Sequence, residues 1–182
     1  MNTPDTANYF NFFGLPVSLH VDLQALRKAY LENSRSFHPD FHTLSTTDEQ
    51  DKALELSSLN NEAFKVLSDT DSRIRYVLEL KGLLGHDSRE EKLPQDFLME
   101  MMDLNEQIMD LQMDPTAEAL KKAQNAVADL EKEIESGVAD LLRQWNESTG
   151  NESDLNVVRD YFHKKRYLLR VKENLTTFAS DF

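Results

Sequence analysis

The chain of 182 residues contains no cysteine. This absence excludes disulfides, thiolate metal sites, cysteine-ligated iron–sulfur clusters and cysteine nucleophiles, and it suits a reducing compartment. No run approaches the roughly 18 consecutive apolar residues that a membrane span needs, and the first residues lack the basic and apolar stretches of a secretory signal. We therefore expect a cytoplasmic protein that does not bind a membrane.

Positive charge is also scarce. The 20 basic residues are outnumbered by 33 acidic ones, which gives a formal net charge of −13. Proteins that bind nucleic acid gain affinity by neutralising phosphates with Lys and Arg, so this balance argues against a nucleic-acid partner. We expect protein partners instead.

Glycine and proline are few, with five of each, and the apolar residues recur at steps of three and four rather than alternating. Both features predict an all-α fold. The length allows two small domains. We predict a first domain over residues 1–82, a linker over 83–93, where glycines precede a helix-starting proline, and an antiparallel three-helix bundle over 94–182.

Local signals predict a helical hairpin with short flanking helices in the first domain. An aromatic turn at 9–13 ends at Gly14, and a second helix runs from an N-cap at Asp22 to before residue 38. A third helix is expected over 47–68 and a fourth over 71–81. The second helix is expected to turn these residues toward the core: Leu23, Leu26, Tyr30 and Phe37.

The bundle is expected to contain three long helices. The first covers 94–113, and the second begins with Asp114 as N-cap and Pro115 as first residue. Its apolar seam continues through Gly137 to Leu141, where the glycine indicates either close approach of a neighbouring helix or a weak point in the core. After a polar turn at 146–153, the last helix is expected to bury one seam: Val157, Tyr161, Leu168, Val171, Leu175 and Phe178, with Lys164 as the polar exception.

The string His38-Pro39-Asp40 separates the two long helices of the first domain. Proline fixes its own φ and restricts the preceding residue, so the flanking imidazole and carboxylate leave the loop in few directions. Such a loop is suited to present side chains to a partner. The alternative is that Pro39 only ends the helix and Asp40 caps a local turn.

Taken together, several motifs resemble the J-domain of DnaJ-type co-chaperones. They are Tyr9-Phe10-x-x-Phe13-Gly14-Leu15-Pro16, the helix with basic residues, His38-Pro39-Asp40, and Leu59-Asn60-x-x-Ala63-Phe64-x-x-Leu67. The opening and Arg73-x-x-Tyr76-x-Leu78-x-Leu80 look more narrowly like HscB, the J-protein of iron–sulfur cluster biogenesis. The resemblance spans nearly the whole chain, because HscB-type proteins carry a three-helix bundle after a short linker.

The resemblance implies that His38, Pro39 and Asp40 dock on a DnaK-class chaperone, HscA in the case of HscB, and stimulate its ATP hydrolysis. It also implies that a basic face of the second helix meets an acidic surface of that ATPase, although an ordinary solvated face is the alternative. The residues of this face are Arg27, Lys28 and Arg35. Many J-domains have lysine after the tripeptide, whereas this chain has Phe41.

The helix over 96–113 carries more methionine and leucine than one core-facing side can use. An inner stripe is predicted at Phe97, Met101, Leu104, Ile108 and Leu111. The surplus lies outside it, and methionine is common at adaptable binding surfaces. Contact with the J-domain or with the third helix of the bundle is the alternative. The surplus residues are Leu98, Met99, Met102 and Met109.

The stretch Phe97-Leu98-Met99-Glu100-x-x-Asp103 is similar to the scaffold-binding helix of the HscB family. The resemblance implies that Leu98, Met99 and Met102 contact an iron–sulfur scaffold protein, IscU in bacteria. It further implies an acidic border and an aromatic residue on the last helix. These residues are Asp103, Glu106, Asp110 and Tyr167.

Three other functions compete with this interpretation. An enzyme lacks support, since there is no Gly-rich phosphate loop and no activated serine. His38 and His42 have the spacing of a helical metal pair, but Pro39 breaks the helix that this spacing requires, so we expect neither a metal nor a cofactor. The other two alternatives are a helical adaptor without chaperone activity and a general DnaJ-type protein with another client.

Overall fold

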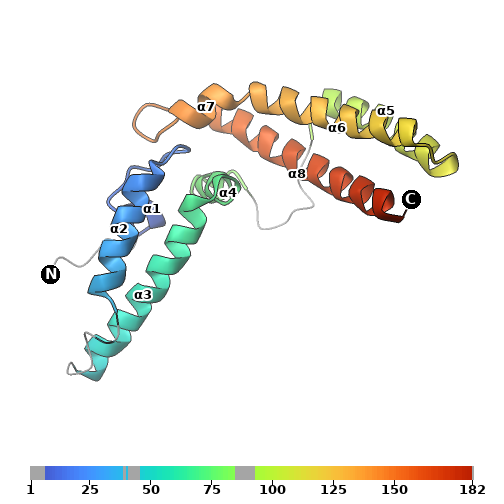
Figure 1. Cartoon of the computed structure of the whole chain (residues 1–182). Helices are drawn as coiled ribbons and strands as arrows, with labels where there is room; N and C mark the ends of the chain where they lie inside the picture. The colour runs from blue at the N-terminus through green and yellow to red at the C-terminus, as the bar shows by residue number, and fades with distance from the viewer. Residues whose placement is uncertain (1–6, 39, 41–45, 85–92, 182) are drawn as a thin grey trace. The chain divides into compact units, whose positions relative to one another are not determined.

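The computed structural model describes residues 7–38, 40, 46–84 and 93–181, and within them every regular element is a helix (Figure 1). This confirms the predicted all-α fold. The chain divides into two compact units. Unit 1 comprises Met1–Lys81 and Arg143–Asn151, and unit 2 comprises Gly82–Leu142 and Glu152–Phe182. The domain limits 1–82, 83–93 and 94–182 remain a prediction, and residues 85–92 of that linker lie outside the described part.

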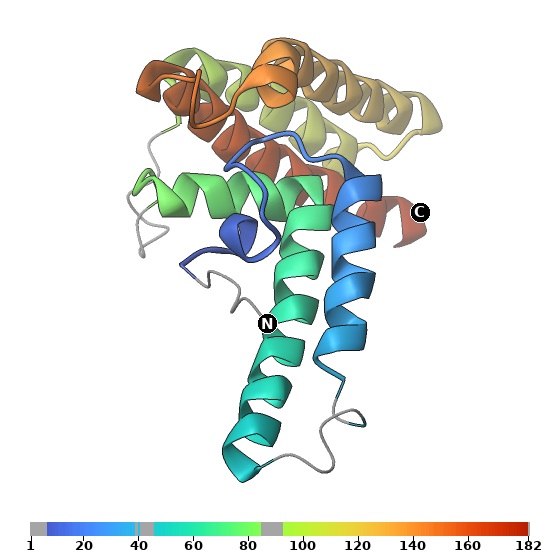
Figure 2. The same ribbon diagram turned by 90° about the vertical axis from the view of Figure 1, so that its left-hand side faces the viewer.

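Unit 1 is built around the helical hairpin of α2 (Leu23–Ser36) and α3 (Thr47–Ser68), which run side by side (Figure 2). The Asp22 carboxylate caps α2 by accepting hydrogen bonds from the backbone N–H groups of Gln24 (2.9 Å) and Ala25 (3.2 Å). A capping box between Thr46 and Glu49 starts α3. The expected limits of both helices are thereby confirmed.

Two shorter helices flank the hairpin. Helix α1 (Tyr9–Phe12) ends at Gly14, whose φ of +65° is a conformation that glycine adopts without strain. Helix α4 (Thr70–Leu80) ends before Gly82, at φ +68°. The ring of Tyr9 stacks on that of Tyr76, with centroids 4.4 Å apart, so the aromatic opening is fixed against α4.

One core assignment in α2 was wrong. Leu26 is fully buried, but Leu23 is 54% exposed. Leu23 is the first residue of α2, directly after the Asp22 cap. The first residue of α2 therefore lies outside the core, although the three-residue spacing of Leu23 and Leu26 would allow both to share one helix face.

A segment distant in sequence completes unit 1. Ser18 and Asn146 form an antiparallel bridge, in which the Leu19 N–H donates to the Trp145 carbonyl (3.2 Å) and the Glu147 N–H to the Val17 carbonyl (2.9 Å). The buried Arg73 guanidinium donates from Nε to the Leu19 carbonyl (2.9 Å). Sequence periodicity gave no sign of this pairing, because it joins two short irregular segments.

Unit 2 is a three-helix bundle of α5 (Gln95–Met113), α6 (Ala117–Ser136) and α8 (Glu152–Asp181). Its core contains buried residues of all three helices, which confirms the predicted bundle. The core residues are Phe97, Met101, Leu104, Leu111, Ala123, Val127, Leu168, Val171 and Leu175.

Three details of the bundle differ from expectation. Helix α6 is capped by Thr116, whose Oγ1 accepts from the Ala119 N–H (3.1 Å), rather than by Asp114. The helix ends at Ser136, with Gly137 as C-cap and a short α7 (Ala139–Gln144) beyond it. Gly137 does not mark close approach of a neighbour, because an added Cβ would meet only its own helix backbone, at 3.7 Å or more.

The predicted seam of the last helix was wrong at its first position. Val157 is 46% exposed, whereas Val158 is fully buried. Leu155 and Tyr161 are also buried, with exposed fractions of 3% and 6%. Residues 155, 158 and 162 share a helix face by three- and four-residue steps, and this face is buried beside Tyr161 in place of Val157. Tyr161 is buried as predicted, and the seam also follows the prediction from Leu168 onward.

Candidate interaction surfaces

The first candidate surface is the end of α2 and the loop after it. Helix α2 ends at Ser36, and the Phe37 ring lies 6.2 Å from the Phe12 ring. The next side chains are open to solvent: His38 is 53% and Asp40 83% exposed. Pro39 and Phe41 lie outside the described residues. The structure therefore places the imidazole and the carboxylate outward, beyond a helix end that is held by an aromatic contact.

His38 and Asp40 also interact with each other. The backbone N–H of Asp40 donates to Nδ1 of His38 (3.2 Å), and Oδ2 of Asp40 lies 3.6 Å from the same nitrogen. An Nδ1 that accepts a hydrogen bond carries no proton, so the neutral ring has its proton on Nε2. His38 and Asp40, two positions apart in the sequence, thus form a local contact.

The basic face of α2 contains the three predicted cations and one apolar residue. Arg27, Lys28, Leu31 and Arg35 follow each other at helical spacing, and all four are exposed. Among the described residues, none of the three cations has an ion-pair or hydrogen-bond partner. Leu31, 45% exposed in the middle of this face, was missed by the sequence analysis. A helical wheel alone could have found it.

The inner stripe of α5 is the one predicted. Phe97, Met101, Leu104 and Leu111 are at most 2% exposed, and Ile108 packs against the same core. These residues occupy one side of the helix and are fully used by packing. The apolar residues elsewhere on α5 therefore lie outside this stripe.

The outer side of α5 is rich in exposed apolar side chains. Their exposed fractions are 44% for Leu98, 62% for Met99, 71% for Met102 and 62% for Met109. Met113, missed by the sequence analysis, is the most exposed at 83%. Met113 is the last residue of α5.

The predicted acidic border lies on the same outer side. Asp103, Glu106 and Asp110 are exposed, and none of them has an ion-pair partner among the described residues. Uncompensated carboxylates next to exposed thioethers favour a partner with both apolar and basic groups.

Tyr167 belongs to α8 and contacts α5. Its ring lies edge-on to that of Phe97, with centroids 6.0 Å apart, and its hydroxyl accepts a hydrogen bond from Nδ2 of Asn105 (3.4 Å). The side chain is half-buried and packs against the bundle core. Tyr167 therefore borders the outer side of α5 at Asn105 while its ring supports the inner stripe.

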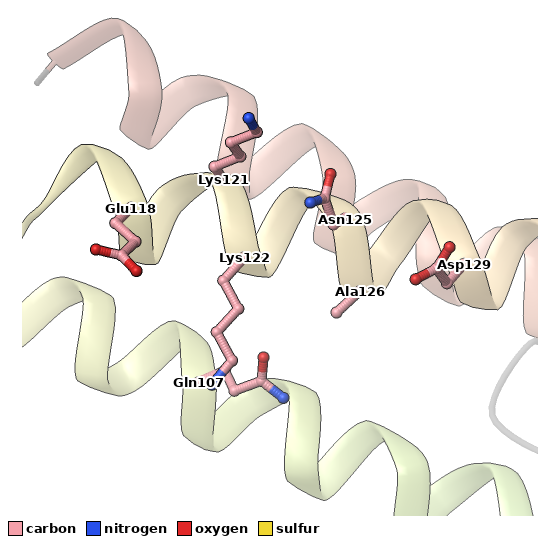
Figure 3. Close-up of a pocket in the computed structure, with 7 residues that line it drawn as sticks. All are labelled: Gln107, Glu118, Lys121, Lys122, Asn125, Ala126 and Asp129. Carbon is pink, nitrogen blue, oxygen red and sulfur yellow. The ribbon is translucent and has the colours of Figure 1, made fainter.

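An open groove lies between α5 and α6, on the side of α5 that carries Gln107 (Figure 3). Two cations, Lys121 and Lys122, and two anions, Glu118 and Asp129, line it. Their charges cancel, and Lys122 extends across toward Gln107 in Figure 3. The groove contains no residue of either candidate surface and no charge that selects a ligand.

Neither a membrane span nor a metal cluster occurs among the described residues. No helix among them is long and apolar enough to cross a membrane. Within the same residues, no three side chains of His, Asp or Glu are grouped so as to hold a metal ion.

Comparison with known proteins decides the family. Residues 93–176 match the family model described as the HSCB C-terminal oligomerisation domain. A Pseudoalteromonas atlantica protein named "Co-chaperone protein HscB homolog" is 35% identical over 184 residues, which cover 96% of this chain and 99% of the relative. The chain belongs to the HscB co-chaperone family. It is thus a co-chaperone of iron–sulfur cluster biogenesis, and its named relatives are co-chaperones rather than enzymes.

More distant HscB proteins agree. The human "Iron-sulfur cluster co-chaperone protein HscB" is 27% identical over 176 residues, 96% of this chain and 70% of the relative. The match to the crystal structure of human HscB covers 99% of this chain and 86% of the human chain. Its TM-score is 0.69 at 26% identity. The HscB structure from Vibrio cholerae matches 96% of this chain and 98% of its own, with a TM-score of 0.62 at 23% identity, a similarity of fold.

Proposed function

We propose that this HscB-family chain stimulates ATP hydrolysis by a DnaK/HscA-class chaperone through the end of α2. The observation that carries the proposal is the exposure of His38 and Asp40 directly beyond a helix whose basic face has no ion-pair partner in the part of the chain that the structure describes. No side chain of this chain carries out the hydrolysis, which takes place on the chaperone. The contact residues are His38, Pro39, Asp40, Arg27, Lys28 and Arg35.

Charge supports the choice of face. The chain as a whole carries −13, so three exposed cations on one helix side form a local exception. Such a face attracts an acidic surface and raises the rate of encounter with it. At the loop, the Asp40 carboxylate can accept a charge-assisted hydrogen bond from a chaperone arginine, which is strong once water is excluded.

We further propose that the outer side of α5 binds an iron–sulfur scaffold protein of the IscU type, which this chain delivers to the chaperone. Leu98, Met99 and Met102 offer flexible apolar contacts, and three carboxylates lie beside them. The acidic border and Tyr167 complete the proposed contact set: Asp103, Glu106, Asp110 and Tyr167.

The ATPase test compares two histidines of unit 1. We expect His38→Gln to abolish stimulation of a DnaK/HscA-class ATPase, in the presence and absence of an IscU-type scaffold, with the melting temperature unchanged. His20→Gln is the matched control, since His20 is exposed and lies outside the α2 face. Full stimulation by the His38 variant would defeat the proposal.

The scaffold test uses isothermal calorimetry. We expect Met99→Ala with Met102→Ala to weaken scaffold binding by about tenfold or more, because exposed apolar anchors dominate binding free energy once they are desolvated. Leu169→Ala is the control, since Leu169 is a 51% exposed residue of α8. Unchanged affinity of the double methionine variant, with the bundle still folded, would contradict this part of the proposal.

A further inference from the structure

The exposed methionines of α5 form a single line that is longer than the proposed scaffold contact. Met99, Met102, Glu106, Met109 and Met113 follow each other at steps of three, four, three and four residues. Residues at this spacing share one side of a helix. Fourteen residues of rise make the line about 21 Å long. We call these five residues the methionine stripe.

Burial separates the methionine stripe from the core. Its four methionines are between 62% and 83% exposed, whereas Met101, on the inner side of the same helix, is 2% exposed. Four of the six methionines in the chain thus lie on one outer line of α5. A spacing of three and four is the pattern by which one helix packs side chains between those of another.

We propose that the methionine stripe is a docking seam for an amphipathic helix of the iron–sulfur scaffold protein, with a Lys or Arg of that helix opposite Glu106. The inference rests on the proposed function and extends it to Met109 and Met113. The partner helix carries apolar residues at matching three- and four-residue steps over about two heptads. The half of the stripe beyond Glu106 is needed for full affinity.

Charge selects this occupant over a second copy of the chain. Glu106 is at the centre of the stripe, so a symmetric pair of identical stripes, parallel or antiparallel, would bring two Glu106 carboxylates together in an apolar seam. Burying like charges there is costly. Asp96, Asp103 and Asp110, seven residues apart along one flank, add a row of negative charge. A partner with basic residues on the matching side satisfies both features.

The first test separates the two halves of the stripe by calorimetry with an IscU-type scaffold. We expect Met109→Ala with Met113→Ala to raise Kd about tenfold, as the other methionine pair does, with Leu169→Ala as the exposed control. If only the Met99 and Met102 pair matters, the extended seam is wrong while the proposed function stands. If neither pair matters, both are wrong.

The second test concerns the charge at the centre. We expect Glu106→Gln to weaken scaffold binding and to reduce its salt dependence. Glu100→Gln is the matched control, because Glu100 is an exposed acid of α5 about 120° away around the helix. Equal effects of the two variants would overturn a specific basic partner for Glu106.

A footprint with hydrogen peroxide reports on the stripe directly. Peroxide transfers one oxygen to the thioether and leaves as water, so each accessible methionine becomes a sulfoxide. We expect the scaffold to slow oxidation of Met109 and Met113 as strongly as that of Met99 and Met102. Unchanged oxidation of Met109 and Met113 in the complex overturns the inference. A doubled mass of the chain alone in sedimentation equilibrium, lost in the Met109 and Met113 variant, overturns it in favour of self-association.

Discussion

The side-chain amide of Asn60 in α3 donates a hydrogen bond to the backbone carbonyl of Tyr30 in α2, at 3.1 Å. The same Nδ2 donates to Oγ of Ser34 (3.0 Å), and Asn60 is only 1% exposed. A buried amide with both donors satisfied across a helical hairpin fixes the register of the two helices, because any shift leaves polar atoms unpaired. The position of the exposed loop beyond α2 therefore depends on a residue of α3.

Removal of this amide is expected to destabilise unit 1. We predict that Asn60→Ala lowers the free energy of unfolding by about 1–3 kcal/mol, because it deletes two buried hydrogen bonds. Urea denaturation followed by circular dichroism measures the change. The neighbouring Asn61 is exposed and only accepts from the Tyr30 hydroxyl (3.0 Å), so Asn61→Ala is the control and is expected to cost less. Equal losses would show that burial of Asn60 contributes nothing.

Two glycines are expected to respond to alanine in opposite ways. A Cβ on Gly150 would overlap the indole ring of Trp145, whose side chain is buried, so Gly150→Ala is expected to lower the melting temperature. Gly137 has helical φ and ψ of −66° and −19° and no close neighbour. Gly137→Ala is expected to stabilise by up to about 1 kcal/mol. Differential scanning calorimetry of both variants checks the signs, and destabilisation by both would contradict the geometry.

Stability is expected to fall at high pH through Tyr9. Burial, together with a hydrogen bond to the Glu62 side chain, raises the pKa of Tyr9 from its ordinary value of 10.0 to about 12. The folded state thus holds this proton more tightly than the unfolded state. Its stabilising contribution is complete below pH 10 and is lost as the pH rises toward 12.

Urea unfolding at several pH values between 9 and about 12 tests this expectation. Tyr9→Phe is expected to lose less stability over that range, because it has no phenol to ionise. Burial also raises the pKa of the stacked Tyr76, so some pH dependence is expected to persist in this variant. A variant that loses as much stability as the natural chain would contradict the assignment to Tyr9.

Leu31 and Arg35 are expected to act on different rates of chaperone docking. Leu31 offers an apolar contact within the basic face of α2, so Leu31→Gln is expected to speed dissociation with little dependence on salt. Arg35→Gln is expected to slow association, and less so at high salt, since screening weakens steering by exposed charges. Surface plasmon resonance at two ionic strengths measures both rates. Leu54→Gln, at a 58% exposed position of α3, is the control.

Much of the fold follows from local signals. Asp22 and Thr46 specify helix starts through side chains that accept backbone N–H groups within three residues, and Gly14 and Gly82 end helices through positive φ. The inner stripe of α5 follows from periodicity in the same way. The exposed surplus on α5 was predicted because one side of a helix cannot bury so many apolar residues.

Where the sequence analysis failed, a distant partner or a helix break decided the result. Val157 and Val158 are adjacent valines, and only the packing of the bundle determines which one is buried. Asn60 reads as a polar surface residue until its partners on α2 are known. At the proposed surfaces, the 83% exposure of Met113 at the end of α5 became evident only from the structure.

The sequence by itself determined the helical class, the ends of α2 and α3, and the presence of a histidine and an aspartate in a proline loop, because each depends on bonds between near neighbours. Only the tertiary structure decided that residues 145–147 pair with 17–19 and that Arg73 is buried against Leu19. Those contacts join segments up to about 130 residues apart in the sequence. Their free energy arises from hydrogen bonds and packing between residues that never occur together in one short stretch of sequence.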